Sequence, residues 1–462
     1  MVEYEYDVAV VGGGLSGMIA ALECSERGHR VVLYEKESSL GGFATSKGVD
    51  QTFNEHSWRS FGAFYTNLRN VTDRLGLAWP DSPVNVVAVP AVSFAVSLGD
   101  VRMLSLLVQG FVHHLDGMRR ISWYGLQRGL SSMGFVSLGR FNKSGSDYHD
   151  IPYATVVRVA ELVLPNRFYF AISPRPIQEY LIQPLERRLR DHGVVIYKGT
   201  KCTTLSPDAL KAACVISAIP PSAYGSLDNT GLYTWCVPRM VQMAKETAHQ
   251  ELSFRIFYSG FLHMKNKNTL DLHQTPWGLL IMPADVYYPH EKWSGSVWSG
   301  TCTDMRGKDR HGRTPTMSSR QECIDSIVEQ LTSYIRLGTI THVNLWDEWV
   351  EVGGKMSSDE VMCVNRCGET SRRPMAGCRL GSRVFLAGAH AGTGTEMWLM
   401  ESAAEAGKRA ARAVLASRGM DADSIHLDPH KRSPTKASYS YLMTAGVLLG
   451  SIWLCRRGSR QR

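Results

Sequence analysis

Short apolar runs alternate with helix-like segments along this chain. Residues 8–11 contain only Val and Ala, and a helix-like pattern that includes residues 20–22 follows them. A second run, residues 30–34, ends at Glu35. Buried parallel strands are continuous apolar runs, and strands that alternate with helices form a parallel sheet. The pattern predicts an α/β fold with a Rossmann-type domain, whose further strands we expect at residues 193–197, 214–219 and 383–386.

The middle of the chain predicts a second sheet. Residues 254–261 and 295–301 read as strands, residues 176–190 as an amphipathic helix, and residues 103–118 have helix-like periodicity. A chain of 462 residues is long for a single core, so we expect two domains. Because strands of the first domain are expected on both sides of this segment, each domain should be discontinuous.

Three glycines directly after the first strand predict a dinucleotide site. They form the motif Gly12-x-Gly14-x-x-Gly17. Gly12 permits the tight turn, Gly14 lets the backbone approach a pyrophosphate, and Gly17 lets the next helix pack closely. The NH groups at the start of that helix would face the anion, and Glu35 is placed to accept hydrogen bonds from a ribose.

A second glycine pair points to the type of dinucleotide. Gly41-Gly42 follows Glu35 closely. At this spacing the chain resembles flavoproteins of the amine oxidase and phytoene desaturase superfamily, in which such a pair brings backbone NH groups to the phosphates of FAD. An Arg commonly follows the pair in that superfamily, whereas Phe43 stands here. The resemblance implies FAD as the cofactor.

The C-terminal part resembles the second FAD signature of the same superfamily. There a strand ends in Ala-Gly-Asp and a helix begins with Met-Glu-Gly-Ala, whereas this chain has Ala387-Gly388 and, at residues 400–403, Met-Glu-Ser-Ala. Ala389 occupies the place of the Asp, and the neighbouring His390 or a water could take over its hydrogen bond. The N-terminus of this helix would point at the flavin or its ribityl chain.

The motifs and the resemblance together imply the cofactor residues and the domain division. FAD should be non-covalent, because the Gly-Cys-Tyr motif that attaches flavin in some amine oxidases has no match here. The FAD-binding domain is expected at residues 1–75, 171–225 and 366–418, and the substrate or cap domain at residues 76–170 and 226–365. The expected cofactor contacts are Gly12, Gly14, Leu15, Ser16, Gly17, Glu35, Lys36, Gly41, Gly42, Gly388, Ala389, His390, Met400, Glu401 and Ala403.

Residues 55–68 read EHSWRSFGAFYTNL and resemble a block found in phytoene-desaturase-like and carotene desaturase flavoproteins. The resemblance implies that this block runs beneath the flavin, where His56 and Arg59 could hydrogen-bond the flavin ring. In the alternative interpretation, Glu55 and Arg59 form a structural ion pair and Trp58 belongs to the core. Hydride removal needs alignment of a C–H bond more than a base. No catalytic residue is therefore assigned, and the candidates near the flavin are His56, Arg59, Trp398 and Leu399.

The residue before Met400 bears on the substrate. Monoamine oxidases place a flavin-framing Tyr there, and this chain has Leu399. The resemblance therefore favours a desaturase or dehydrogenase that acts on an apolar isoprenoid or polyene-like substrate. A flavin-containing amine oxidase is the alternative, and a redox-neutral isomerase or dehydroxylase that uses reduced FAD is a second one. The sequence leaves open whether the electron acceptor is oxygen or a quinone. A third alternative is a protein that binds flavin but catalyses no reaction.

Charge and cysteine patterns exclude other classes. The net charge of +8 comes mostly from seven Lys or Arg after residue 430, so a nucleic-acid surface is not expected. Ten cysteines lack metal-like pairing, which predicts no metal site and free thiols in an intracellular protein without a signal peptide.

An uncharged apolar segment near the C-terminus suggests a membrane anchor. Residues 437–455 carry no charge and would span about 28 Å as a helix, just enough for a hydrocarbon core. We expect residues 419–436 to be a linker and residues 437–462 to be a tail anchor with a basic end, with the catalytic body in the cytosol.

Overall fold

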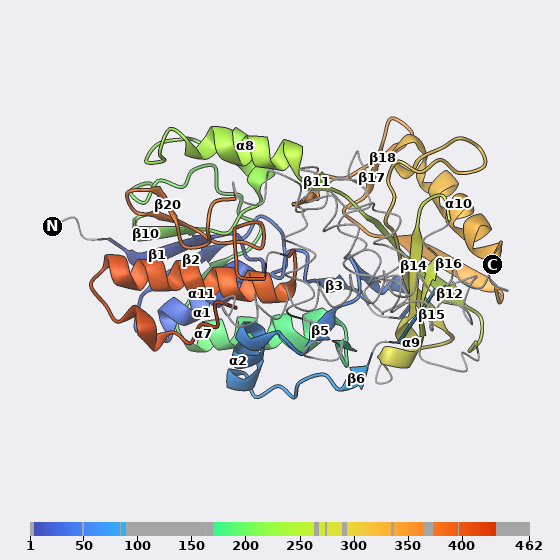
Figure 1. Ribbon diagram of the computed structural model, residues 1–462, viewed down its shortest axis with the longest axis horizontal. Coiled ribbons are helices and arrows are strands. Elements are labelled where there is room, and N and C mark those ends of the chain that lie inside the picture. Colours follow the sequence, from blue (N-terminus) through green and yellow to red (C-terminus); the bar gives the residue numbers. More distant parts are fainter. Residues whose placement is uncertain are drawn as a thin grey trace, which may run out of the picture.

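The computed structural model describes residues 4–48, 50–83, 85–88, 162, 170–262, 268–272, 275–288, 293–333, 337–363, 373–395 and 397–430. Two six-stranded sheets lie toward opposite ends of the long axis of the molecule (Figure 1). The first half of the molecule contains the N-terminal part of the chain and helix α11 (Met400–Ser417). The described part of the chain therefore has the expected two-part organisation.

The first sheet has the strand order β20-β21-β10-β1-β2-β9. All neighbouring pairs are parallel except β20, which is antiparallel to β21 at one edge. The central strands are mostly buried and carry mainly small or apolar residues, as expected for a sheet covered on both faces. Its strands are β1 (Tyr6–Val11), β2 (Val31–Tyr34), β9 (Val195–Tyr197), β10 (Ala212–Ser217), β20 (Arg379–Gly381) and β21 (Val384–Leu386).

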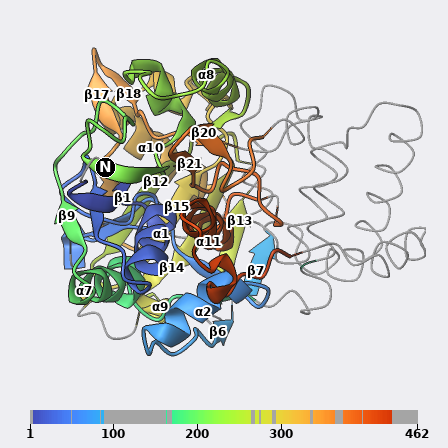
Figure 2. The same cartoon turned by 90° about the vertical axis from the view of Figure 1, so that its left-hand side faces the viewer.

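Every residue of helix α1 (Leu15–Ser25) is buried. The helix lies beside the long helix α11 (Met400–Ser417), as Figure 2 shows. Glycine makes this contact possible, because a Cβ at Gly407 would lie 2.4 Å from the carbonyl oxygen of Ser16. Helix α7 (Gln183–Asp191) also packs on α1. The N-termini of α1 and α11 are thereby held next to the carboxyl ends of β1 and β21.

The second sheet has the order β16-β12-β15-β14-β13-β7, antiparallel except for the β13–β7 pair. Its core contains Trp277, Trp346 and Trp349, and helix α10 (Arg320–Thr332) packs there behind a Ser319 capping box. The strands are β7 (Asn85–Ala88), β12 (Leu252–Tyr258), β13 (Asn268–Leu272), β14 (Leu279–Pro283), β15 (Val297–Cys302) and β16 (Ile340–Leu345).

The remaining elements are mostly short. The helices are α2 (Thr66–Arg74), α8 (Cys236–Glu246) and α9 (Ala284–Tyr287), with 3₁₀ turns at Asp50–Thr52, Pro221–Ser226, Pro315–Met317 and Ala422–Ser424. The strands are β3 (Ser46–Lys47), β4 (Asn54–Glu55), β5 (Ser60–Gly62), β6 (Ser82–Pro83), β8 (Phe170–Ile172), β11 (Ala248–His249), β17 (Val350–Val352), β18 (Lys355–Ser357) and β19 (Met362–Cys363).

The sequence pattern located each predicted strand of both sheets to within a few residues. One helix differs: the pattern at residues 176–190 begins as a π-helical segment, Gln178–Ile182, before α7 starts at Gln183. The expected helix at residues 103–118 and the apolar segment at residues 437–455 lie outside the described residues. Among the helices that are described, none is long and apolar enough to cross a membrane.

The stretch expected as a linker is ordered in its described part. Residues 419–430 lie on the first domain, and the side chain of Ile425 is 1% exposed within the core that contains α1 and α11. The proposed division into domains stays a prediction, but residues 419–430 pack as part of the body.

Candidate cofactor and active site

A cavity of about 1020 Å³ lies where the two halves meet. Its wall combines the turn between β1 and α1, the end of β2, the residues after β21 and the start of α11 with residues after β16 and β18. A volume near 1000 Å³ suits a large cofactor or ligand. Of the expected cofactor residues, all but Gly17 and Glu401 line this cavity.

The glycine motif shapes the first part of the wall. A Cβ at Gly17 would lie 1.9 Å from the carbonyl oxygen of Gly12, so only glycine allows α1 to start this close to β1. A Cβ at Gly14 would meet no atom nearer than 4.0 Å, because this glycine borders open space. Gly14 precedes α1 without a side-chain cap, so the helix presents free NH groups and the positive end of its dipole to the cavity. The arrangement fits a pyrophosphate.

Glu35 lies at the end of β2 and is buried. Its Oε2 accepts a hydrogen bond from the Gly13 NH at 2.6 Å and its Oε1 accepts one from the Glu37 NH at 2.9 Å. Burial raises the pKa of Glu35 above the usual value, although the two NH donors oppose this shift. A carboxylate has further lone pairs, so it can also accept hydrogen bonds from a ribose in the cavity. Gly13, which sequence reasoning missed, positions this acid.

The second glycine pair packs directly on the first motif. The Gly41 NH donates to the Gly13 carbonyl at 2.9 Å, and a Cβ at Gly42 would lie 3.2 Å from the Gly14 Cα. Both glycines of the pair have positive φ angles, +119° for Gly41 and +56° for Gly42. The two loops therefore approach each other in a way that side chains would prevent, and both face the same cavity.

The C-terminal signature completes this part of the site. The Gly388 NH donates to the Ser16 hydroxyl at 2.9 Å, which joins the end of β21 to the start of α1. His390 is 2% exposed and lines the cavity, and burial lowers its pKa to about 3, so the ring is neutral. No hydrogen-bond partner of its Nε2 is found among the described residues. A neutral imidazole next to Ala389 thus offers a polar atom to a ligand.

Glu401 is placed differently from its neighbours Met400 and Ala403. Those two line the cavity, whereas the Glu401 carboxylate is fully buried behind it and hydrogen-bonds helix α2 and His430. The structure therefore gives Glu401 a structural contact instead of a direct cofactor contact.

Aromatic rings form the wall beyond the phosphate region. Phe43 packs edge-to-face on His56 at 4.8 Å and on Trp398 at 5.9 Å between ring centroids. His56 continues to Trp346 at 6.4 Å, and Leu399 also lines the cavity. Three of the four sequence candidates for the flavin environment, His56, Trp398 and Leu399, are thus part of one largely apolar wall.

Arg59, the fourth candidate, lines the cavity and donates to the Ser57 hydroxyl at 2.8 Å. The ion pair of Glu55 is formed with Arg255, at 3.8 Å, and both side chains are fully buried. The Tyr288 hydroxyl donates to Glu55 at 3.3 Å, and burial raises the pKa of Glu55 to about 7. The contact between Glu55 and Arg255 thus joins the two halves of the molecule. No local motif in the sequence predicts it.

A polar group at the far end of the cavity was not predicted. The Trp346 indole NH donates to Glu360 at 2.8 Å, and burial raises the pKa of Glu360 to about 7. Lys47 lies over the Trp346 ring at 5.0 Å and pairs with Glu348 at 3.0 Å. These residues come from β3 and from the loops after β16 and β18, so no single motif contains them.

Comparison with known proteins agrees with this geometry. The family model described as FAD dependent oxidoreductase matches residues 7–103, and the one described as flavin containing amine oxidoreductase matches residues 188–415. The two matched segments supply both glycine motifs and the C-terminal signature. The two matches together show an FAD-dependent oxidoreductase that is similar to the flavin amine oxidase and phytoene desaturase superfamily. The superfamily indicates FAD as the cofactor of this flavoprotein, as expected from the sequence, and the residues that line the cavity fit it.

Two curated relatives are carotenoid enzymes. Over 240 residues the flavoprotein is 27% identical to the carotenoid phi-ring synthase of Chlorobaculum tepidum, which covers 42% of this chain and 37% of that protein. Over 71 residues it is 42% identical to the zeta-carotene desaturase of a Synechocystis species, which covers 15% of this chain and 14% of that one. The chain thus matches only a minor part of the length of these relatives.

Solved structures share the fold. A putrescine oxidase has a TM-score of 0.61 at 15% identity, with 89% of this chain and 99% of that chain covered. The cyclohexylamine oxidase of Brevibacterium oxydans has a TM-score of 0.59 at 16% identity, with 90% and 99% covered. At this identity the likeness supports the two-domain fold of flavin amine oxidases and nothing finer.

Proposed function

We propose that this flavoprotein binds FAD non-covalently and dehydrogenates an apolar, isoprenoid- or polyene-like substrate. The observation that carries the proposal is the aromatic and aliphatic wall of Phe43, His56, Trp398 and Leu399 next to the phosphate-binding loops. When bound, FAD supplies a flavin ring that accepts a hydride from the substrate. The carotenoid enzymes among the relatives support the same substrate class.

The residues of the chain hold the cofactor and orient the substrate. Backbone NH groups at the start of α1 and in the Gly41–Gly42 loop would hold the phosphates, and Glu35 would hold a ribose. The apolar wall would exclude water and align an extended hydrocarbon, since hydride transfer depends on alignment of a C–H bond. Leu399 leaves the site without a Tyr at the position where monoamine oxidases frame the flavin.

Amine oxidation is the second candidate, and one observation favours it. The acidic residues Glu251, Glu348, Asp359 and Glu360 all line the cavity. Lys47 is paired with Glu348, but the acidic character of this end would suit a protonated amine. The electron acceptor that returns FAD to its oxidised form is proposed to be oxygen or a quinone.

Anaerobic titration of the purified flavoprotein distinguishes the candidates. We expect isoprenoid or polyene substrates in detergent to bleach the flavin absorbance, and small primary amines to leave it unchanged. Bleaching by putrescine or benzylamine at ordinary enzyme rates would contradict the proposal and establish amine oxidation. A polyene that is converted only after chemical reduction of the flavin would instead indicate a redox-neutral isomerase or dehydroxylase.

A further inference from the structure

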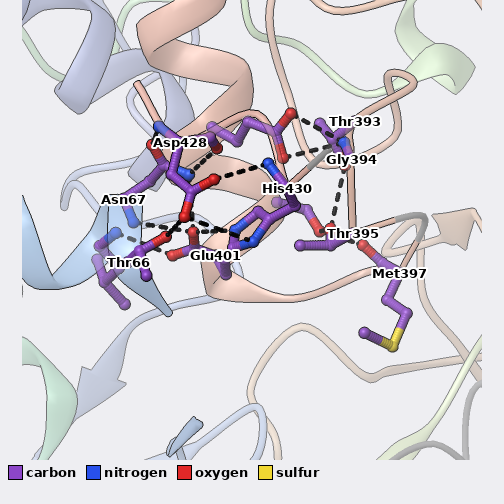
Figure 3. Close-up of polar contacts among 12 residues, drawn as sticks. Thr66, Asn67, Thr393, Gly394, Thr395, Met397, Glu401, Asp428 and His430 are labelled. Atoms are coloured by element: carbon purple, nitrogen blue, oxygen red, sulfur yellow. Dashed lines mark hydrogen bonds and ion pairs between the residues drawn. The ribbon is translucent and has the colours of Figure 1, made fainter. Parts of the chain in front are cut away.

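The segment at residues 428–430 returns to the start of the cofactor helix α11 (Figure 3). The Nε2 atom of His430 lies 2.7 Å from the Oε1 atom of Glu401, in the first turn of α11. Both side chains are buried, with exposed fractions of 5% for His430 and 0% for Glu401. The contact therefore joins two ionisable groups inside the protein, where the loss of one partner is costly because it leaves the other buried and unpaired.

Glu401 also serves the N-terminus of helix α2. Its carboxylate accepts the backbone NH groups of Asn67 and Leu68, each at 2.9 Å. These are the second and third residues of α2, whose own N-cap, Tyr65, has no side-chain capping bond. One buried carboxylate thus caps α2 from another helix and binds His430 at the same time.

Further bonds fix the segment in one register. The Asn67 side chain donates to the Asp428 carbonyl at 2.7 Å and accepts from the Asp428 NH at 2.9 Å. The Thr66 hydroxyl donates to the Asp428 carboxylate at 2.8 Å. This reciprocal pairing explains why the segment is ordered although nothing in its sequence predicts a helix or strand.

The loop that leads into α11 packs against the same segment. A Cβ at Gly394 would lie 2.0 Å from the carbonyl oxygen of Pro429, so the two backbones are in close contact. The Gly394 NH donates to Glu405 of α11 at 2.8 Å, and the Ser402 hydroxyl contacts Thr395 at 2.5 Å. The loop, the first turns of α11, the start of α2 and residues 428–430 therefore form one connected cluster.

This cluster lies directly behind the cofactor wall. Met400 and Ala403, on either side of Glu401 in the first turn of α11, line the cavity. We propose that residues 428–430 act as a latch that holds the first turn of α11 in the position required for the cofactor, with His430 as its positioning residue. The inference rests on the proposed FAD site and goes beyond it, because it places the control of cofactor affinity in a C-terminal segment.

The charges around His430 give the latch a pH dependence. Burial lowers the pKa of His430, but the hydrogen bond to Glu401 and the charges of Glu401, Asp428 and Glu405 outweigh it and raise the pKa above the usual value. Cationic groups also face these carboxylates: Arg409 pairs with Glu405 at 2.7 Å, and the charge of Lys408 acts on Glu401. The protonated latch is therefore fully favourable below the unfolded-state pKa of about 6.5 and weakens as the pH rises through the folded-state value.

FAD release from the full-length holoprotein tests the latch. Release is followed by the rise in flavin fluorescence after dilution, between pH 6 and 8.5. We expect wild-type release to accelerate across this range, and His430→Ala to release FAD about tenfold faster than wild type at pH 6, the effect of one lost charge-assisted hydrogen bond. His430→Gln, which keeps a neutral donor, should restore much of the affinity but show a flat pH profile.

His426→Gln is the matched control, because this histidine is exposed and lies just before residues 428–430. It should keep the wild-type release rate and pH profile. Hydrogen exchange provides an independent readout: linkage requires that FAD slows exchange in peptides covering residues 419–430. The latch is refuted if His430→Ala releases FAD at the wild-type rate and these peptides exchange equally with and without FAD.

Failure of the FAD assignment would look different. In that case the wild-type protein itself would contain no flavin. Exchange in residues 419–430 would still report on the latch without the cofactor, because His430→Ala should then exchange faster than wild type and His426→Gln should not.

Discussion

Replacing Glu35 by Gln should weaken FAD binding and leave the cofactor-free protein about as stable as wild type. In the folded chain this carboxylate is buried, and burial raises its pKa, which means that the charge is unfavourable there without a ligand. Gln removes the charge and can keep an acceptor for the Gly13 NH, now at 2.6 Å. It loses the acceptor for the Glu37 NH, at 2.9 Å.

The two effects on the cofactor-free protein oppose each other. Loss of one backbone hydrogen bond costs about 1 kcal/mol, and relief of the buried charge acts in the opposite direction. Binding has no such compensation, because a bond from a ribose hydroxyl to a charged acceptor is stronger than one to an amide by about 1–2 kcal/mol. The dissociation constant for FAD should therefore rise about 5- to 30-fold.

Fluorescence quenching of FAD gives the dissociation constant, and thermal unfolding without FAD gives the stability. Glu5→Gln is a suitable control, because Glu5 is an exposed acid before β1, away from the cavity. An affinity within threefold of wild type would refute the ribose assignment. A large loss of stability without FAD would instead show that Glu35 is mainly structural.

Three further predictions follow from the site. Acid precipitation should release all flavin into the supernatant, and flavin retained in the pellet would refute non-covalent binding. Gly17→Ala should abolish FAD binding or folding, as measured by flavin content and thermal unfolding, because its Cβ would lie 1.9 Å from the Gly12 carbonyl oxygen. Burial raises the pKa of Glu360 to about 7, so its ionisation is unfavourable in the folded state. We therefore expect the free energy of unfolding to fall as the pH rises from 5 to 8. The melting temperature of Glu360→Gln should therefore rise relative to wild type over that range, and a constant difference would contradict the burial argument.

The cofactor loops were predictable because their requirements are local. A glycine is needed where backbone approaches backbone, and Gly12, Gly17 and Gly41 meet this need within a few residues of a strand. Glu35 follows its strand directly, so its place at the carboxyl edge of the sheet follows from the strand itself. The residues that line the cavity from these loops could therefore be named from the sequence.

The contacts that join distant segments could not be predicted in this way. Glu55 finds its partner Arg255 in a strand of the other sheet, and Trp346 finds Glu360 beyond a hairpin. The polar composition around His430 is typical of a linker, although its side chain is buried against Glu401. Such residues carry no periodic signal, because their environment comes from packing between elements rather than from the element that contains them.

Two departures from the superfamily pattern become related once the structure is considered. Phe43 replaces an expected cation and Ala389 an expected anion, and both residues line the same cavity. The Phe43 ring packs on Trp398, and the ring of His390, next to Ala389, lies 6.4 Å from the same indole. At these two positions the superfamily pattern has a cation and an anion, whereas this chain has two uncharged residues beside aromatic contacts. The net charge of the pair is therefore the same. A bound pyrophosphate would therefore rely on backbone NH groups and the α1 dipole.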